Sequence, residues 1–463
     1  MTVNIVAKSY SGKYGTDADV GDIIHVEVSI GTETSGNAVN KEIILLIDVS
    51  GSMEDSMKSV KSSLLAFRDS IVGKSHLEME TLSSEDRDTL LRDKINIRLI
   101  TFSNTAKEVW SFESGGTFEQ AVLKLEVEAM TNMGDALKLA FEKVNPTSFS
   151  WIIVMTDGES NKGPCQTSES FQRLVTASKP LNCKVVSLGY GSSFDPEVLN
   201  VVGSFAYVES VEMIPVVLGN LASEIMTSVG FNCVVDIVGS TRMGELTDDT
   251  IIVPEGEDEV ILGRTIGGNR VIEALCCGNT YHYVYLPHGR NSSRDQLETY
   301  KTINIQYTDI STGVTIYSDH QIDHTHDIVH SHDIPPNSIR EIVFETKKKV
   351  LVQRLYEVIQ KQNNRKSLKK EVDMIEKVIE GWGDDDLVTP HKEEILRMIK
   401  NIDVSNNRVH RAGTVLNYLV GTGYSMVGLG DDTDSDSPTN QYLGSTLTGT
   451  NYYLTSPLIN NNQ

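Results

Sequence analysis

A carboxylate and two hydroxyls stand at the end of an apolar stretch close to residue 50. Ile43–Ile47 has the composition of a buried strand. Asp48, Ser50 and Ser52 follow it directly, before a helical pattern begins. In an open α/β sheet, ligands bind in the crevice beyond the carboxyl ends of the strands. These three side chains therefore fall where such a sheet binds its ligands.

Two further segments bring oxygen-bearing side chains to the same edge. Thr131 stands where a helical pattern opens, and Asp157 closes the apolar stretch Trp151–Met155. The combined set contains only carboxylate and hydroxyl oxygens, without sulfur or imidazole, and such a set selects a hard cation. We therefore predict a Mg²⁺ site, with Mn²⁺ as the alternative, whose ligands are Asp48, Ser50, Ser52, Thr131 and Asp157.

The predicted set contains few charged ligands and several neutral hydroxyls. The ion would keep coordination positions held by water, and an acidic side chain of another protein could complete its octahedron. The expected function is divalent-cation-dependent binding of a protein partner, with a rim formed around Gly51, Met53, Asn132 and Gly158.

The elements around these residues read as a parallel sheet covered by helices. Apolar stretches without polar alternation predict five strands, at Ile43–Ile47, Ile95–Phe102, Trp151–Met155, Lys184–Leu188 and Phe205–Val208. Helical patterns lie between them, at Met57–Ile71, Gly134–Val144, Ser168–Ala177 and Val211–Val229. The charged stretch Lys74–Lys94 is expected to be a surface excursion. This alternation predicts an α/β fold with a doubly wound, mostly parallel, Rossmann-like sheet.

After Phe231 the pattern changes to short alternating stretches between turn residues, which predicts an antiparallel β-sandwich. Its expected strands are Cys233–Val238, Thr250–Val253, Glu259–Leu262, Tyr281–Leu286, Thr302–Tyr307, Val314–Tyr317 and Ile339–Phe344. Val3–Ala7 and Asp22–Ile30 have the same character and are expected to complete this sandwich. The α/β domain would then be an insertion.

From Lys347 onward the apolar residues recur with a helical period, which predicts a small C-terminal helical bundle. Its stripes cover Val350–Ile359 and Leu368–Trp382, a third helix that opens at Thr389-Pro390, and Val409–Leu419. The acidic and polar tail beyond it is expected to be disordered, with a docking strand as the alternative. The predicted boundaries are 1–40 for the N-terminal strands, 41–229 for the α/β domain, 230–346 for the sandwich, 347–421 for the bundle and 422–463 for the tail.

The three ligand segments resemble the metal-ion-dependent adhesion site of von Willebrand factor A (VWA) domains. Asp48-x-Ser50-x-Ser52 is similar to its first part, and Thr131 and Asp157 stand in the Thr-Asn-x-Gly-Asp-Ala-Leu and Thr-Asp-Gly contexts of the other two. The resemblance implies a VWA fold, a Mg²⁺ site that binds proteins, and no enzymatic activity.

The overall layout also resembles intracellular eukaryotic VWA proteins in which the A domain sits within a β-sandwich followed by helices. Gly203–Glu209 and Leu218–Ile225 carry this narrower, Vwaint-like resemblance. Some such proteins add a RING or a protein-splicing domain, but five scattered cysteines supply neither. A ubiquitin-pathway adaptor without a RING is therefore kept only as an alternative.

Simpler interpretations exist for the same residues. Asp48, Ser50 and Ser52 could form a helix-capping turn, since Asp and Ser favour that role. A hydrolase could use Asp48 as a nucleophile, although Ser50 stands where a second acid is usual. A scaffold protein could carry the site without using it. Asp135 is expected to cap or buttress its helix, and Glu159 to lie on the rim.

Histidines cluster in the predicted sandwich, interleaved with aspartates. Residues two apart on a strand share a face, so a pair of these histidines could bind a transition metal. A polar strand with ordinary hydrogen bonds or a pH-responsive surface are the other interpretations. The cluster comprises His320, His324, His326, His330 and His332. The five cysteines lack paired spacing and read as reduced thiols, with Cys276 and Cys277 expected to be buried.

The charge balance limits the classes of partner. The net charge of -23 would repel a phosphate backbone, so no nucleic acid is expected. No stretch approaches the roughly 18 apolar residues that span a membrane, and residues 1–11 lack a signal-peptide pattern. We therefore expect a cytoplasmic protein without a membrane segment, and the sequence makes no prediction of its oligomeric state.

Overall fold

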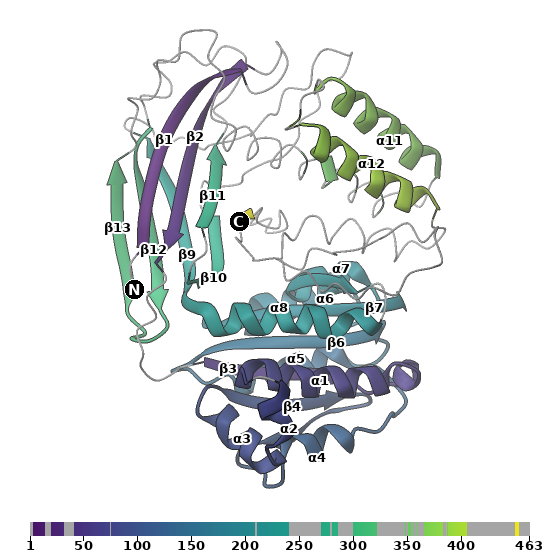
Figure 1. Cartoon of the computed structure of the whole chain (residues 1–463). Coiled ribbons are helices and arrows are strands. Elements are labelled where there is room, and N and C mark those ends of the chain that lie inside the picture. The colour runs from purple at the N-terminus through teal and green to yellow at the C-terminus, as the bar shows by residue number, and fades with distance from the viewer. Residues whose placement is uncertain are drawn as a thin grey trace.

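The computed structural model describes three groups of elements: an α/β domain, two smaller sheets and C-terminal helices (Figure 1). The described residues are 3–13, 20–31, 41–74, 76–208, 211–239, 270–277, 280–285, 300–321, 348, 351–352, 355, 359, 365–382, 386, 388–404 and 450–452. Within these ranges no helix is long and apolar enough to cross a membrane.

The α/β domain is built on one six-stranded sheet with the strand order β5-β4-β3-β6-β7-β8. The strands are β3 (Lys41–Asp48), β4 (Asn96–Phe102), β5 (Ala106–Ser111), β6 (Phe149–Gly158), β7 (Cys183–Ser193) and β8 (Ser204–Val208). All pairs are parallel except β4 with β5. The predicted doubly wound, mostly parallel sheet is therefore confirmed, and the antiparallel edge strand β5 is an addition to it.

Helices cover both faces of this sheet. They are α1 (Met57–Val72), α2 (His76–Glu80), α3 (Ser84–Arg92), α4 (Phe118–Leu123), α5 (Met133–Lys143), α6 (Ser168–Ser178), α7 (Pro196–Val202) and α8 (Ile214–Thr227), with 3-10 turns η1 (Gly51–Glu54) and η2 (Val211–Met213). Ile44 and Leu46 of β3 join the buried residues of α5, α6 and α7 in one apolar cluster. Ile43, Leu45 and Ile47 join those of α1 and α8 in the other. Successive residues of β3 face opposite sides and both sides are covered, so the strand is apolar from Ile43 to Ile47.

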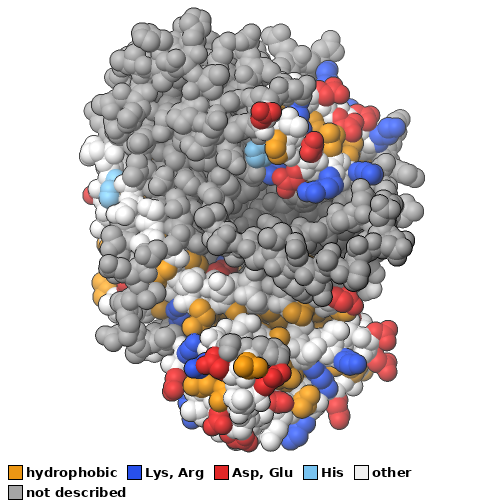
Figure 2. Space-filling model, in the orientation of Figure 1, with side chains coloured by type: hydrophobic (Ala, Val, Ile, Leu, Met, Phe, Trp, Pro, Cys, Tyr) orange, Lys and Arg blue, Asp and Glu red, His pale blue; other side chains and the backbone are white. Residues whose placement is uncertain are grey.

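The predicted surface excursion contains the short helices α2 and α3. The second of them contacts α1 and α4. Figure 2 shows acidic, basic and hydrophobic side chains interspersed on this side of the α/β domain. The described residues on this face therefore form no continuous basic surface.

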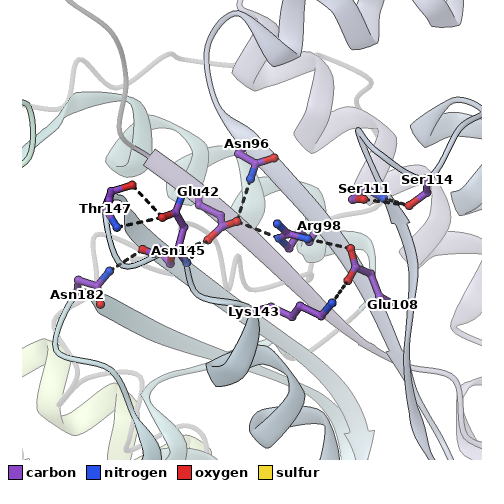
Figure 3. Close-up of polar contacts among 11 residues, drawn as sticks. Glu42, Asn96, Arg98, Glu108, Ser111, Ser114, Lys143, Asn145, Thr147 and Asn182 are labelled. Atoms are coloured by element: carbon purple, nitrogen blue, oxygen red, sulfur yellow. Dashed lines mark hydrogen bonds and ion pairs between the residues drawn. The ribbon is translucent and has the colours of Figure 1, made fainter.

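The amino end of the sheet is fastened by the buried carboxylate of Glu42 (Figure 3). Its Oε1 atom accepts hydrogen bonds from Asn96 Nδ2 at 2.9 Å and from Arg98 Nε at 3.0 Å. Its Oε2 atom accepts the Asn145 N–H at 3.1 Å and the Ser150 hydroxyl at 2.9 Å. Every oxygen of this buried acid is therefore hydrogen-bonded, and one donor is a guanidinium.

The Arg98 guanidinium extends this network toward the edge of the sheet. It also pairs with Glu108 on β5 at 3.0 Å, and Lys143 at the end of α5 contacts the other oxygen of Glu108 at 2.9 Å. The network links the four adjacent strands β5, β4, β3 and β6 to a helix, so its role is structural.

Two four-stranded sheets lie outside the α/β domain. One has the order β1 (Val3–Lys13), β2 (Val20–Ile30), β11 (Thr280–Tyr285) and β14 (Thr450–Tyr452), and the other the order β10 (Arg270–Cys276), β9 (Ser228–Gly239), β12 (Tyr300–Asp309) and β13 (Thr315–Gln321). β2 pairs antiparallel with β11, so strands from before and after the α/β domain share one sheet. β1 contacts β13 of the other sheet. The predicted additional antiparallel structure is confirmed in this form.

Three residues of the predicted tail form β14, which pairs parallel with β11. The alternative of a docking strand therefore applies to Thr450–Tyr452, because their backbone groups complete a sheet edge whatever the composition of the tail. The rest of the segment 422–463 lies outside the described residues, as do the predicted strands 250–253, 259–262 and 339–344 and the predicted helix 409–419.

The described C-terminal helices are α11 (Arg365–Glu380) and α12 (Thr389–Val404). α12 begins at the Thr-Pro pair, as predicted. Buried residues of both helices, with Leu351, Leu355 and Ile359, belong to the apolar cluster that contains α5, α6 and α7. C-terminal helices following the sheets are therefore confirmed.

Candidate functional site

Asp48 is held at the carboxyl end of β3 by two hydrogen bonds. Its side chain is fully buried. Its Oδ1 atom accepts the Ser50 N–H at 2.8 Å, and its Oδ2 atom accepts the hydroxyl of Thr156, on the adjacent strand β6, at 2.6 Å. The Ser50 side chain makes no capping hydrogen bond to η1, so the helix-cap interpretation is wrong for this residue. The carboxylate is thus fixed beneath the turn that starts η1.

A row of hydrogen bonds joins Ser50, Ser52 and Asp157. The two serine hydroxyls are 3.1 Å apart, and the Ser52 hydroxyl donates to Asp157 Oδ1 at 2.6 Å. Ser50 is buried and Ser52 is exposed, so the row runs from the interior to the surface. β3 and β6 are neighbouring parallel strands and end at the same edge. With Asp48, this edge brings together four of the five predicted ligands.

Thr131 reaches the same place beside Gly158. A Cβ atom at Gly158 would lie 3.1 Å from the Ser52 hydroxyl and 3.8 Å from the Thr131 hydroxyl, so the two hydroxyls flank this glycine. The loop before α5 is tied to the loop after β3, because Gly51 N–H donates to the Ala129 carbonyl at 3.2 Å. The fifth predicted ligand therefore lies next to the other four.

Asn132 supports the start of α5 and is not a rim residue as predicted. Its side chain is buried. Its Oδ1 atom accepts the Asp135 N–H at 3.3 Å, while its Nδ2 donates to Asp135 Oδ2 at 2.7 Å and to the Asn104 carbonyl at 3.2 Å. The side chain turns inward because the unpaired N–H groups of the first helical turn attract an acceptor. Asp135 buttresses the same turn, as expected.

Met53 is also buried and does not contribute to the rim as predicted. The turn of η1 directs its sulfur onto Tyr190 of β7, whose hydroxyl donates to Met53 Sδ at 2.8 Å. Burial, together with the charges of Asp157 and Asp48, raises the pKa of the Tyr190 phenol well above its ordinary value. A neutral tyrosine therefore forms part of the floor under the site.

The two carboxylates of the site lack a basic counter-charge. Burial raises the pKa of the Asp48 carboxyl to about 6, and the charge of Asp157 acts in the same direction against the hydrogen bonds from Thr156 and Ser50. Burial also raises the pKa of Asp157, against the Ser52 hydrogen bond. No Lys, Arg or His of the described ranges forms an ion pair with either carboxylate. Two buried acids therefore carry uncompensated negative charge at neutral pH.

The donor set fits a hard divalent cation. Ligands of Mg²⁺ lie about 2.1 Å from the ion, so neighbouring ligands in an octahedron are about 3 Å apart. The 3.1 Å between the Ser50 and Ser52 hydroxyls matches that spacing. No three His, Cys, Asp or Glu side chains cluster as metal ligands in the part of the chain that is described, so a cation here would depend on hydroxyl oxygens as well as Asp48 and Asp157.

Sequence reasoning missed three supporting residues. Thr156 could have been noticed, since it directly precedes Asp157. Asn161 accepts the Thr131 N–H at 2.9 Å through its side chain, and Tyr190 lies under Met53. Nothing local in the sequence marks these two, because their contacts cross between distant segments.

Of the predicted histidine cluster, only His320 is among the described residues, whereas all five cysteines are. His320 lies on β13, where its Nε2 is 2.7 Å from the Ser318 hydroxyl. His324, His326, His330 and His332 lie outside the described residues. All five cysteines are free thiols; Cys276 is buried as expected, whereas Cys277 is half-buried.

Comparisons with known proteins bear on the domain family and the fold. The model of the von Willebrand factor type A domain family matches residues 42–210. A structure of the ArnB paralog VWA2 from Sulfolobus acidocaldarius is similar at a TM-score of 0.52 and 15% identity, covering 91% of this chain and 98% of that chain. A von Willebrand factor type A structure from Catenulispora acidiphila is similar at a TM-score of 0.56 and 12% identity, covering 91% and 96%. A search of curated proteins returned no significant match.

A third solved structure is less similar. It is proximal thread matrix protein 1 from the mussel byssus with a zinc-occupied MIDAS motif, with a TM-score of 0.33 and 19% identity over 43% of this chain and 50% of that chain. That score is too low to transfer anything to this chain.

The comparisons support a fold and a domain family. The two structures with TM-scores above 0.5 cover 91% of the chain, so the likeness of fold extends beyond the α/β domain. The narrower resemblance to intracellular eukaryotic proteins stays a prediction. Residues 42–210 are a von Willebrand factor type A domain, a type of domain that generally mediates protein binding.

Proposed function

We propose that this chain binds a protein partner through a divalent cation held at the carboxyl edge of β3 and β6. The observation that carries the proposal is the meeting of two buried carboxylates without a basic counter-charge and three hydroxyls at one surface edge. A buried charge without a partner is costly, and a bound cation offsets that cost. We favour Mg²⁺, with Mn²⁺ as the alternative, because every donor is a hard oxygen.

In this proposal the five ligand residues contribute two kinds of donor. Asp48 and Asp157 supply the negative charge, while Ser50, Ser52 and Thr131 add neutral donors. A bound Mg²⁺ would supply an open coordination position for an acidic side chain of the partner. Ser52 is the exposed member of the set and lies closest to an incoming partner.

We expect binding and not catalysis. An aspartate nucleophile is usually paired with a second acid two positions on, and Ser50 stands at that position. The hydrolase alternative therefore lacks its second acid. Assays with phosphomonoester and peptide substrates are expected to show no turnover that depends on Asp48.

The test is capture of proteins on the immobilised full chain in Mg²⁺ followed by elution with EDTA. The wild-type chain is expected to release a set of proteins on chelation, and Asp157→Ala is expected to lose that set. Asp373→Ala is the matched control, because Asp373 is an exposed acid on α11. Retention of the same proteins by Asp157→Ala, or their indifference to EDTA, would overturn the proposal.

A further inference from the structure

The loop after β6 is fastened to Thr131 by several hydrogen bonds. The N–H groups of Asn161 and Lys162 both donate to the Thr131 carbonyl, at 3.0 Å and 3.1 Å. The Asn161 side chain accepts the Thr131 N–H at 2.9 Å, and the Ser160 hydroxyl lies 3.4 Å from the Thr131 carbonyl. Lys162 is therefore held at a fixed place beside one of the proposed ligands.

The ammonium group of Lys162 is oriented toward a second loop. Its Nζ donates to Asn104 Oδ1 at 2.9 Å, and the carbonyl of the same Asn104 accepts a hydrogen bond from Asn132. Gly163 allows this close approach, because it has a φ of 84° and a Cβ there would lie 2.2 Å from Asn132 Oδ1. Three loops at the carboxyl edge thus place one exposed ammonium group.

Lys107 and Lys162 differ in their partners. Lys107 pairs with Glu128 at 2.8 Å, and Glu128 is bound in turn by the Ser103 hydroxyl. Lys162 is exposed, and no carboxylate pairs with it within the described ranges. The amide oxygen of Asn104 orients the Lys162 ammonium group and does not neutralise its charge. In a chain of net charge -23, Lys162 therefore keeps a positive charge at this edge that an acidic group of a partner can pair with.

We propose that Lys162 is a second contact point for the partner, and that the segment bound at this edge carries two acidic side chains. The first carboxylate would bind the proposed cation beside Ser52 and Asp157. The second would pair with the Lys162 ammonium. This inference rests on the proposed function, because it assumes that an acidic segment docks at the same edge. Beyond the proposed function, it states that the bound segment is diacidic and that Lys162 sets the specificity for the second acid.

The test is selection of peptides from a random 12-residue display library on the immobilised full chain in Mg²⁺. Peptides recovered on the wild-type chain are expected to carry two acidic residues, and recovery is expected to fall away in EDTA. On Lys162→Gln the selected peptides are expected to keep one acidic residue and lose the second. Lys370→Gln removes the same charge from an exposed position on α11 and is expected to select like the wild type.

Synthetic copies of the selected peptides then give the size of the effect. An exposed ion pair contributes little, so Lys162→Gln is expected to weaken the binding of a diacidic peptide about twofold to fivefold. A copy with the second acid changed to its amide should bind wild type and variant alike. Selected peptides with a single acid, or equal affinities for wild type and Lys162→Gln, overturn the role of Lys162 and leave the proposed function intact. Failure to select any Mg²⁺-dependent peptide overturns both.

Discussion

The two ends of β3 each hold a fully buried acid, and the two acids have opposite surroundings. Glu42 at the amino end accepts four hydrogen bonds, one of them from the Arg98 guanidinium. Asp48 at the carboxyl end accepts one hydroxyl and one N–H, and the charge of another acid, Asp157, acts on it. One strand thus carries a compensated acid, Glu42, and an uncompensated acid, Asp48, six positions apart.

The difference separates structure from function. A buried acid that accepts hydrogen bonds from a guanidinium and several other donors ties together the elements that carry those donors. A buried acid with a raised pKa and no basic partner is held by the fold at a cost, and such groups are concentrated at functional sites. By this reasoning Glu42 fastens the sheet and Asp48 is available to a cation.

The largest expected effect is on Glu42. Glu42→Ala leaves Arg98 and the other donors without their acceptor, and removal of one partner of a buried pair costs about 3 kcal/mol. The free energy of unfolding, measured with urea, should fall by about that amount without a change in slope. Glu126→Ala, at an exposed position of the same domain, is the control and should change little. Equal stability of the two variants would contradict the structural role assigned to Glu42.

A third buried charged residue on β3, Lys41, makes the stability of the chain depend on pH. Lys41 donates to the carbonyls of Ile225 and Met226, both at 2.9 Å, at the end of α8. Burial lowers its pKa from 10.5 to about 8, although the thiols of Cys276 and Cys277 act in the opposite direction. Between these two pKa values the unfolded chain binds more protons than the folded chain, so the contribution of Lys41 to stability rises with pH.

Lys41→Met removes this titration. The stability of the wild-type chain relative to Lys41→Met should rise by about 2 kcal/mol between about pH 8 and about pH 9.5, since each pKa unit is worth about 1.4 kcal/mol. Urea unfolding at several pH values, in the presence of a reductant, measures the difference. A difference that stays constant or falls with pH would mean that Lys41 keeps its ordinary pKa in the folded chain.

The sequence predicted the strands best where burial is complete. Ile43–Ile47 of β3 and Trp151–Met155 of β6 are continuous apolar segments because helices cover both faces, and this pattern cannot be confused with an edge strand. β5 was missed because it is short, half-exposed and interrupted by charged residues. α7 was missed although Asp195 and Pro196 are a common start of a helix, since its seven residues are too few to show a period.

The five proposed ligands were predictable for a related reason. Each one follows a buried strand or opens a helix, so its place at the sheet edge follows from topology. The direction of a side chain within a turn does not follow from topology, and this is why Met53 and Asn132 were wrongly placed on the rim. The orientation of Lys162 depends on Asn104, which lies 58 positions away in the sequence, so no local pattern indicates it.

Calorimetric titration of Mg²⁺ into the full chain at pH 7, with Asp48→Asn beside the wild type, tests the central claim most directly. The substitution keeps the acceptor for the Ser50 N–H and removes the charge, and the Thr156 hydroxyl can turn to the Gly158 carbonyl, 3.1 Å away. The account predicts saturable binding by the wild type, none by Asp48→Asn, and a metal-free variant at least as stable as the wild type. Equal Mg²⁺ binding by both chains, or none by the wild type, would contradict it.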